Sequence, residues 1–240
     1  MDNKRASQLL NIEDIHTYYG ESYILQGVSL SVGEGEIVCL LGRNGAGKTT
    51  LMRSIIGLSP PASGMITFQH EKINNLPPYR IADKGIGYVP QGQGIFAELT
   101  VLENIRLGLR KKRLKSHPEI DKVFQYFPIL KDRITQKGGT LSGGERQMLA
   151  IGRGLVGGIR LMLLDEPTEG IQPSIIHQLK EIIKRINEEM DLSILIVEQN
   201  IELALDVGNR YYVMQNGTIV ESGCVDNIER TEMIEKYLTI

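Results

Sequence analysis

The chain has 240 residues, of which 41% are hydrophobic and 23% are charged, so it can bury a sizeable core and is not expected to be disordered. Its 27 basic and 29 acidic residues give a net charge of −2, which favours neither a polyanion-binding surface nor an acidic tail. Two cysteines, Cys39 and Cys224, lie far apart and outside any CxxC or Cys/His cluster, which argues against a disulfide framework and a zinc site.

The N-terminal segment, residues 1–17, carries acidic residues early and has no long apolar core, which argues against a signal peptide. No stretch of the chain approaches the roughly 20 apolar residues that a membrane-spanning helix requires. We therefore expect a cytosolic chain whose association with a membrane depends on a partner.

Short apolar segments predict the β-strands. Residues 28–32 alternate apolar and polar side chains, as a half-exposed strand does. Other segments are apolar almost throughout, and they lie at 36–42, 87–91, 160–167 and 192–199. Continuous apolar strands of this kind are typical of a parallel sheet with helices on both faces.

Helical segments separate these strands: one follows Gly47, one runs from Ser142 to about Val156, and one runs from Ser174 to Met190. Strand and helix alternate at this spacing in α/β folds, so the sequence predicts the α/β class.

The stretch from about 94 to 139 has helix-like periodicity, prolines and a basic run but no buried strand, and it predicts a mostly helical insert. Its basic run, Arg110 to Lys115, has two interpretations, a nucleic-acid contact or a solvated helix face, and we favour the second. Further on, Asn216 and Gly217 lie between two strand-like runs, which indicates a β-hairpin. An amphipathic helix over 227–238 is predicted near the end of the chain.

The segment GRNGAGKTT, residues 42–50, follows a predicted buried strand and precedes a helix, and its pattern GxxxxGKT is typical of a phosphate-binding loop. Glycines permit backbone angles that turn successive N–H groups toward an anion, and the helix adds its positive N-terminal end. Lys48 can reach the β- and γ-phosphates, and the Thr49 hydroxyl can bind Mg²⁺. The predicted ATP-binding residues of this loop are Gly42, Arg43, Asn44, Gly45, Ala46, Gly47, Lys48, Thr49 and Thr50.

Two adjacent acids, Asp165 and Glu166, end another buried strand, and a second buried charge is unfavourable unless a cation or polar group compensates it. The carboxyl ends of parallel strands face one edge of a sheet, so we expect both acids opposite the phosphate loop. Asp165 is then a candidate for holding Mg²⁺, and Glu166 for orienting or deprotonating the water that attacks the γ-phosphate. The alternative is that both acids cap the following helix.

The segment LSGGERQ, beginning at Leu141, places Ser142, Gly143 and Gly144 at a predicted helix start, where exposed N–H groups suit an anion. Serine is also an ordinary N-cap and glycine an ordinary turn residue, so this motif is weak when taken alone. It is strong in combination with the phosphate loop and the paired acids.

The order GRNGAGKTT, VPQ, LSGGERQ and LMLLDEP resembles the ATP-binding subunit of ABC transporters over essentially the whole chain. The resemblance implies a RecA-like P-loop NTPase core with a mainly parallel sheet, an N-terminal antiparallel β subdomain and an inserted α-helical subdomain. It also implies one ABC ATPase domain over 1–240, with the insert at about 94–139 and the rest of the domain in 1–93 and 140–240.

By the same resemblance, Ser142, Gly143 and Gly144 act in trans on the ATP held by a second cassette, so ATP hydrolysis requires a dimer. Gln91 is implied as the residue that senses Mg²⁺ and couples to the membrane subunit; the alternative is a plain polar residue after a strand. Tyr19 is implied to stack on adenine, with neighbouring Tyr18 as the alternative.

Two positions depart from the family pattern. Gln199 stands where a histidine is usual, and glutamine can hydrogen-bond a γ-phosphate but cannot donate a proton as imidazolium does. Gln199 is therefore predicted to assist catalysis while Glu166 carries more of it. Gln172 replaces the aspartate usual in the segment 169–173, which puts communication between the two ATP sites through that residue in doubt.

The segments VPQG, GERQMLAIGRGL, DEPTEGIQPSII and VEQN together are similar to the ATPases of branched-chain amino acid importers and of urea or short-chain amide importers. That similarity implies a second ABC ATPase subunit in a homo- or heterodimer, two transmembrane permease subunits, an extracytoplasmic solute-binding protein, and a peripheral position on the cytoplasmic face of the membrane. It implies no nucleic acid. The alternative is a soluble non-transport ABC ATPase that serves as a scaffold or remodels nucleic acid or ribosomes.

Overall fold

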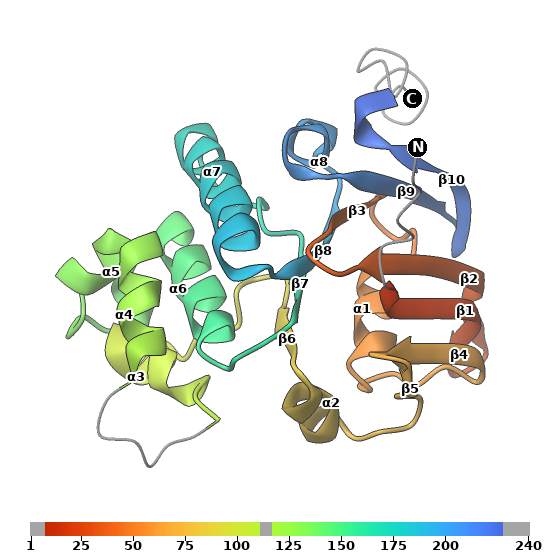
Figure 1. Cartoon of the computed structure of the whole chain (residues 1–240), viewed down its shortest axis with the longest axis horizontal. Coiled ribbons are helices and arrows are strands. Elements are labelled where there is room, and N and C mark those ends of the chain that lie inside the picture. The colour runs from red at the N-terminus through yellow and green to blue at the C-terminus, as the bar shows by residue number, and fades with distance from the viewer. Residues whose placement is uncertain (1–7, 111–116, 228–240) are drawn as a thin grey trace.

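Two β-sheets organise the fold in the computed structural model, which describes residues 8–110 and 117–227 (Figure 1). The smaller sheet has the strand order β2-β1-β4-β5, and every pairing in it is antiparallel. Its strands are β1 (Gln8–Tyr19), β2 (Ser22–Gly33), β4 (Ser63–Phe68) and β5 (Glu71–Lys72). This sheet contains the predicted half-exposed segment, in which Val28, Leu30 and Val32 are buried while Ser29 is exposed.

The larger sheet has the strand order β10-β9-β3-β8-β7-β6, and all its pairings except β9 with β10 are parallel. Its strands are β3 (Ile37–Leu41), β6 (Ile86–Val89), β7 (Leu161–Asp165), β8 (Ser193–Glu198), β9 (Arg210–Gln215) and β10 (Thr218–Cys224). Asn216 and Gly217 join β9 to β10 as the predicted hairpin. Every residue of β3, β7 and β8 is buried, which confirms the prediction of strands covered on both faces.

Alternate side chains of the parallel strands pack on opposite faces, because successive Cβ atoms of a strand point to opposite sides. Cys39 and Leu164 join the core formed with the helices, whereas Leu40 and Leu163 join the core formed with the smaller sheet. The large sheet therefore lies between two hydrophobic cores and is held rigidly on both sides.

Helices surround the large sheet, and their described bounds are α1 (Lys48–Ile55), α2 (Pro78–Lys84), α3 (Val101–Leu107), α4 (Pro118–Tyr126), α5 (Pro128–Asp132), α6 (Gly143–Leu155), α7 (Pro173–Met190) and α8 (Ile201–Val207). Two short 3-10 turns occupy η1 (Gly138–Thr140) and η2 (Val225–Asn227). The three helices predicted from periodicity correspond to α1, α6 and α7. Among the described helices, none is long and apolar enough to cross a membrane.

The stretch 94–139 contributes α3, α4 and α5, which gather with α6 on the side of the molecule away from the smaller sheet (Figure 1). Most of the predicted basic run, residues 111–115, lies outside the described residues, and so does the predicted C-terminal helix beyond Asn227. Arg110, which is described, donates to the backbone carbonyls of Ala82 and Asp83 at the end of α2.

Candidate functional site

The phosphate loop lies between the buried strand β3 and the first turn of α1, as its sequence predicts. Gly45 and Gly47 have φ angles of 82° and 108°, which side-chain-bearing residues rarely adopt. A Cβ atom at Gly47 would also lie 3.1 Å from Leu25 Cδ2, so the conformation favours glycine there and the space is tight. The loop borders a cavity of about 390 Å³ lined by Ile24, Asn44, Gly45, Gly47, Lys48, Thr49, Thr50, Gln91 and Glu166.

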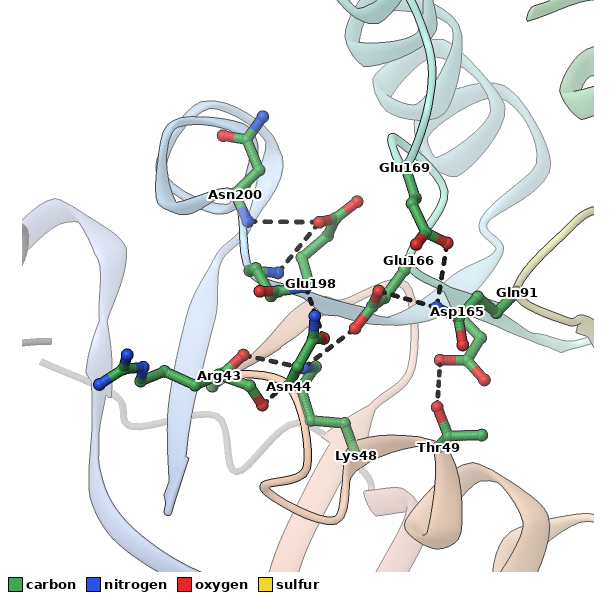
Figure 2. Close-up of polar contacts among 12 residues, drawn as sticks. Arg43, Asn44, Lys48, Thr49, Gln91, Asp165, Glu166, Glu169, Glu198 and Asn200 are labelled. Atoms are coloured by element: carbon green, nitrogen blue, oxygen red, sulfur yellow. Dashed lines mark hydrogen bonds and ion pairs between the residues drawn. The ribbon is translucent and has the colours of Figure 1, made fainter. Parts of the chain in front are cut away.

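Lys48 points from the start of α1 into this site and has three polar partners (Figure 2). Its ammonium donates to the carbonyl oxygens of Gly42 at 2.8 Å and Arg43 at 3.1 Å, and it lies 3.0 Å from Glu166 Oε1. The side chains of Lys48 and Glu166 are only 3% and 5% exposed. A buried charge of each sign is thus compensated by the other, with backbone oxygens completing the lysine's hydrogen bonds.

Asp165 ends β7 and is 1% exposed. Its two carboxylate oxygens accept hydrogen bonds from Thr49 Oγ1 at 3.2 Å and from Tyr88 Oη at 2.9 Å. Burial raises the pKa of Asp165, while the bonds from Tyr88 and Thr49 favour its ionised form. Burial and the neighbouring Asp165 charge raise the pKa of Tyr88, so that residue stays a hydrogen-bond donor at neutral pH. Asp165 and Thr49 together present hard oxygen atoms, which are the ligands Mg²⁺ prefers.

Glu166 follows directly with φ of 47°, a left-handed conformation that is strained for a side-chain-bearing residue. Its N–H donates to the Val197 carbonyl at 2.9 Å, and its Oε2 accepts from Gln91 Nε2 at 3.2 Å. Gln91 Nε2 also donates to Glu169 Oε2 at 3.0 Å. Gln91 therefore lies just after β6 and lines the same cavity, where it contacts the carboxylate of Glu166, the candidate catalytic residue.

Gln199 lies just beyond β8 and its Nε2 donates to Asn44 Oδ1 at 2.7 Å. This contact places Gln199, which stands where the family usually has a histidine, directly against the phosphate loop. The structure therefore brings Gln199 and Asn44 together across a large separation in the sequence.

Tyr18 and Tyr19 point to different surroundings, although their exposed fractions of 45% and 41% are similar. The Tyr18 ring stacks on Tyr23, with centroids 4.6 Å apart and planes at 9°. The Tyr19 hydroxyl lies 3.2 Å from Ser59 Oγ, beyond the end of α1. Burial acts to raise the pKa of Tyr19, but hydrogen bonding to Ser59 and to side chains of α1 lowers it on balance. Tyr19 thus lies against the helix that begins at the phosphate loop, whereas Tyr18 is engaged elsewhere.

Ser142, Gly143 and Gly144 of the LSGGERQ segment do not line the cavity around Lys48. Ser142 caps α6: its Oγ accepts from the Glu145 N–H at 3.3 Å, and Glu145 Oε2 accepts from the Ser142 N–H at 2.8 Å. A Cβ atom at Gly144 would lie 2.6 Å from Ile175 Cγ2, so α6 begins close against α7. The structure brings the loop, the paired acids, Gln91 and Gln199 together but leaves this motif apart.

The sequence-based prediction does not include Ile24, Tyr88, Glu169 or Glu198 among the site residues, and Glu169 is the acid bonded by Gln91. Ile24 lies in β2 and lines the cavity, while Tyr88 lies in β6 and bonds Asp165. Glu198 ends β8 as a buried acid, as Asp165 ends β7, although it lacks the adjacent second acid that singled out Asp165. An acid at the end of an apolar strand is a weak local signal that could have identified Glu198, whereas no local signal marks Ile24 or Tyr88.

Comparison with known families matches residues 25–169 to the family described as ABC transporter. The high-affinity branched-chain amino acid transport ATP-binding protein BraG of Pseudomonas aeruginosa is 44% identical over 213 residues, covering 88% of this chain and 91% of that protein. The probable branched-chain amino acid transport ATP-binding protein LivF of Archaeoglobus fulgidus is 35% identical over 231 residues, covering 95% and 97%. The lipopolysaccharide export system ATP-binding protein LptB of Escherichia coli is 34% identical over 233 residues and 95% of each chain.

Solved structures show the same architecture. An ATP-binding cassette of an ABC transporter superposes with a TM-score of 0.84 at 27% identity, covering 97% of this chain and 99% of that one. A dimeric bacterial ABC transporter cassette superposes with a TM-score of 0.81 at 26% identity, covering 91% and 100%. These similarities confirm the α/β fold with its antiparallel β subdomain.

Proposed function

Because the chain belongs to the ATP-binding subunits of the ABC transporter family, we propose that it hydrolyses ATP to energise uptake of branched-chain amino acids through separate membrane subunits. Relatives named for branched-chain amino acid transport support this class of solute. Urea and short-chain amides are the second candidate, supported by the segment TEGIQPSII. The named relatives serve transport or export, which does not favour a non-transport ATPase.

One observation carries the ATPase proposal: Lys48, Glu166 and Gln91 line a single cavity, with Asp165 bonded to Thr49 beside it. A cation at the end of a glycine loop binds phosphate, and a carboxylate that faces it from the turn after another strand of the same sheet can bind the attacking water. Such a combination of groups suits hydrolysis of a nucleoside triphosphate.

In the proposed mechanism, the backbone N–H groups of residues 42–47 hold the β-phosphate and Lys48 binds the β- and γ-phosphates. Glu166 orients a water molecule in line with the γ-phosphate and accepts its proton as the water oxygen bonds to phosphorus. The bond from phosphorus to the β–γ bridging oxygen breaks, and ADP and phosphate are released. Gln199 hydrogen-bonds the γ-phosphate but accepts no proton, so Glu166 alone serves as the base.

The donor set fits Mg²⁺, because the buried Asp165 carboxylate accepts from the Thr49 hydroxyl and its burial is unfavourable without a compensating cation. Thr49 and Asp165 would hold the ion, with Gln91 beside them. When bound, Mg²⁺ would neutralise part of the charge on the β- and γ-phosphates.

The adenine ring is proposed to stack on Tyr19, because that side chain lies against α1 while Tyr18 stacks on Tyr23. The second wall of the site is proposed to come from Ser142, Gly143 and Gly144 of another cassette. ATP favours the closed dimer and its hydrolysis releases the two cassettes. This change between closed and open dimers moves the membrane subunits.

ABC cassettes of this family act as dimers with membrane permease subunits. We propose two permease subunits, an extracytoplasmic solute-binding protein and a position on the cytoplasmic face of the membrane. We also propose that residues 1–240 form one ABC ATPase domain, with 94–139 as its helical insert. Nucleic acid is not among the proposed partners.

The test is ATP-dependent uptake by vesicles that contain this chain assembled with its membrane subunits and the solute-binding protein. Vesicles should accumulate labelled leucine, isoleucine or valine when ATP is inside, whereas accumulation of urea or acetamide would support the second solute class. Hydrolysis of ATP without uptake of any of these solutes would contradict the importer proposal.

The matched variants in this assay are Lys48→Ala and Lys84→Ala. The first removes the phosphate-binding ammonium and should abolish uptake and ATP binding measured by calorimetry. The second removes a surface lysine paired with Glu71, and because exposed ion pairs contribute little, it should leave both unchanged. Unchanged ATP binding by Lys48→Ala would contradict the assignment of the phosphate loop.

A further inference from the structure

Glu198 is a carboxylate buried at the carboxyl end of β8, with 3% of the residue exposed. It does not line the cavity around Lys48, and the mechanism above does not use it. A buried carboxylate is unfavourable unless its oxygens are fully hydrogen-bonded. The hydrogen-bond partners of Glu198 therefore indicate which segments this side chain holds in place.

Both Glu198 oxygens accept hydrogen bonds, and each of their partners described below is a donor. Oε1 accepts from the Thr168 N–H at 2.9 Å and from Thr168 Oγ1 at 2.7 Å. Oε2 accepts from the Gln199 N–H at 3.0 Å. It also accepts from the Asn200 N–H at 3.3 Å (Figure 2). Burial raises the pKa of Glu198, and these bonds oppose that shift. The arrangement matches an ionised carboxylate, which is an acceptor only.

The Thr168 side of this contact fixes the turn that carries Glu166. Glu166 has the strained φ of 47°, and such a conformation persists only when the surrounding structure enforces it. Two contacts with β8 and its final side chain do so: the Glu166 N–H bonds the Val197 carbonyl, and Thr168 bonds Glu198. Glu198 thereby limits where the Glu166 carboxylate can point.

The other Glu198 oxygen fixes the segment that carries Gln199. By accepting from the N–H groups of Gln199 and Asn200, it holds the chain as it leaves β8. Gln199 then reaches Asn44 of the phosphate loop, and Asn200 caps α8 by accepting from the Leu203 N–H at 3.1 Å. One carboxylate thus connects the turn after β7 with the segment after β8.

We propose that Glu198 is a positioning residue that holds Glu166 and Gln199 in the geometry required for hydrolysis, a proposal that rests on the ATPase function above. It acts through Thr168 on one side and through the Gln199 and Asn200 N–H groups on the other. It has no direct contact with the cavity, so it affects turnover through the residues it holds.

The test compares Glu198→Gln with wild type in the full chain assembled with its membrane subunits. The variant keeps size and shape but places an NH₂ group against donors, so one side of the contact is lost. We expect kcat for ATP hydrolysis to fall on the order of tenfold or more, since small misplacement of catalytic groups has effects of this size. KM and ATP affinity should stay within about twofold, because the phosphate loop keeps its own contacts.

Glu36→Gln is the matched control. Glu36 is also a largely buried carboxylate: it pairs with Arg210 and accepts from the Gly33 N–H at 2.7 Å, but it precedes β3 at the end of the strand opposite to the phosphate loop. The Glu36→Gln variant should lower the melting temperature without lowering kcat. An unchanged kcat in Glu198→Gln, or a loss of kcat matched by Glu36→Gln at equal destabilisation, would overturn the proposal.

Thr168 provides a second pair of variants if Glu198→Gln does not fold. Thr168→Val removes the hydroxyl bond to Glu198 with little change in shape and should lower kcat at constant KM, whereas Thr168→Ser should restore it. Equal activity of the valine and serine variants would overturn the proposal. Hydrolysis by the wild-type assembly is measured first, so a failure of the ATPase function is distinguished from a failure of the role of Glu198.

Discussion

At the residue scale, Lys48 uses all three of its ammonium donors within the protein, on Gly42, Arg43 and Glu166. Phosphate oxygens that bind Lys48 must therefore replace at least one of these partners. Glu166 is the partner that rotates most readily, because it is a side chain while the others are backbone carbonyls. ATP binding is thus expected to separate Glu166 from Lys48 and make its carboxylate available to the attacking water.

Glu166→Gln is predicted to abolish steady-state ATP turnover while retaining ATP. Glutamine cannot accept the proton of the attacking water, so kcat should fall on the order of 10²-fold or more. Retained ATP is expected because the variant also loses the charge that competes for Lys48. Turnover is measured by phosphate release and bound nucleotide by filter binding, with the exposed Glu98→Gln as a charge-matched control. Normal phosphate release by Glu166→Gln would reject the assignment.

Gln199→Ala is predicted to lower kcat less than Glu166→Gln does. A hydrogen bond to a charged phosphate is worth about 1.5–3 kcal/mol, which corresponds to about 10- to 100-fold in rate. Removing the amide also loses the contact with Asn44, which adds to the effect through the phosphate loop. The two variants are compared in one phosphate-release assay. A loss equal to or larger than that of Glu166→Gln would show that Gln199 carries the main catalytic role.

At the element scale, α3 and α6 both begin with a capping box. Thr100 and Ser142 each accept from the backbone N–H three residues on, and Glu103 and Glu145 each accept in return from the cap N–H. The local stabilisation of the two helices is therefore comparable. Only the α6 cap belongs to the motif proposed to contact ATP on a second cassette.

Ser142→Ala and Thr100→Ala therefore form a matched pair of variants. Each should destabilise the fold by about 1 kcal/mol, because each loses one N-cap hydrogen bond. Only Ser142→Ala should also lower ATP turnover, since Ser142 is proposed to bind the γ-phosphate in trans. Urea unfolding measures the first effect and phosphate release the second. Equal turnover in the two variants would mean that Ser142 serves only as a helix cap.

At the scale of the whole molecule, the cavity around Lys48 is lined by the phosphate loop, β2, the segment after β6 and the turn after β7. The described lining does not include Ser142, Gly143 or Gly144. The proposal that these three residues come from another cassette agrees with the dimeric solved structure of a cassette of the same family.

ATP is predicted to double the molecular mass of the Glu166→Gln chain, because ATP bound without turnover joins two cassettes. Light scattering coupled to size exclusion measures the mass, with ADP as the control that should leave it unchanged. The experiment is repeated with the second cassette of the assembly, since a heterodimer remains one of the two expectations. No increase in mass in either case would contradict a shared ATP site.

Much of the fold follows from local patterns. The unbroken apolar character of β3, β7 and β8 predicted buried parallel strands, and the periodicity of residues 174–190 predicted α7 nearly to its ends. The antiparallel pairing of β1 with β4 could not be predicted from periodicity, because it depends on contacts between distant segments. The antiparallel β subdomain was expected only from the resemblance to the ABC family.

The sequence by itself determined which groups could bind phosphate and where the buried strands β3, β7 and β8 and the helices α1, α6 and α7 would lie, because glycine spacing, capping and hydrophobic periodicity act over a few residues. Only the tertiary structure decided that Gln199 bonds Asn44, that Tyr19 rather than Tyr18 lies against α1, and that Glu198 holds Thr168. These contacts join segments far apart in the chain. The contacts of Gln199 and Glu198 exist because β8 lies between β3 and β7 in the parallel sheet, which places the carboxyl ends of these strands side by side. The Tyr19 contact depends instead on how the smaller antiparallel sheet packs near α1.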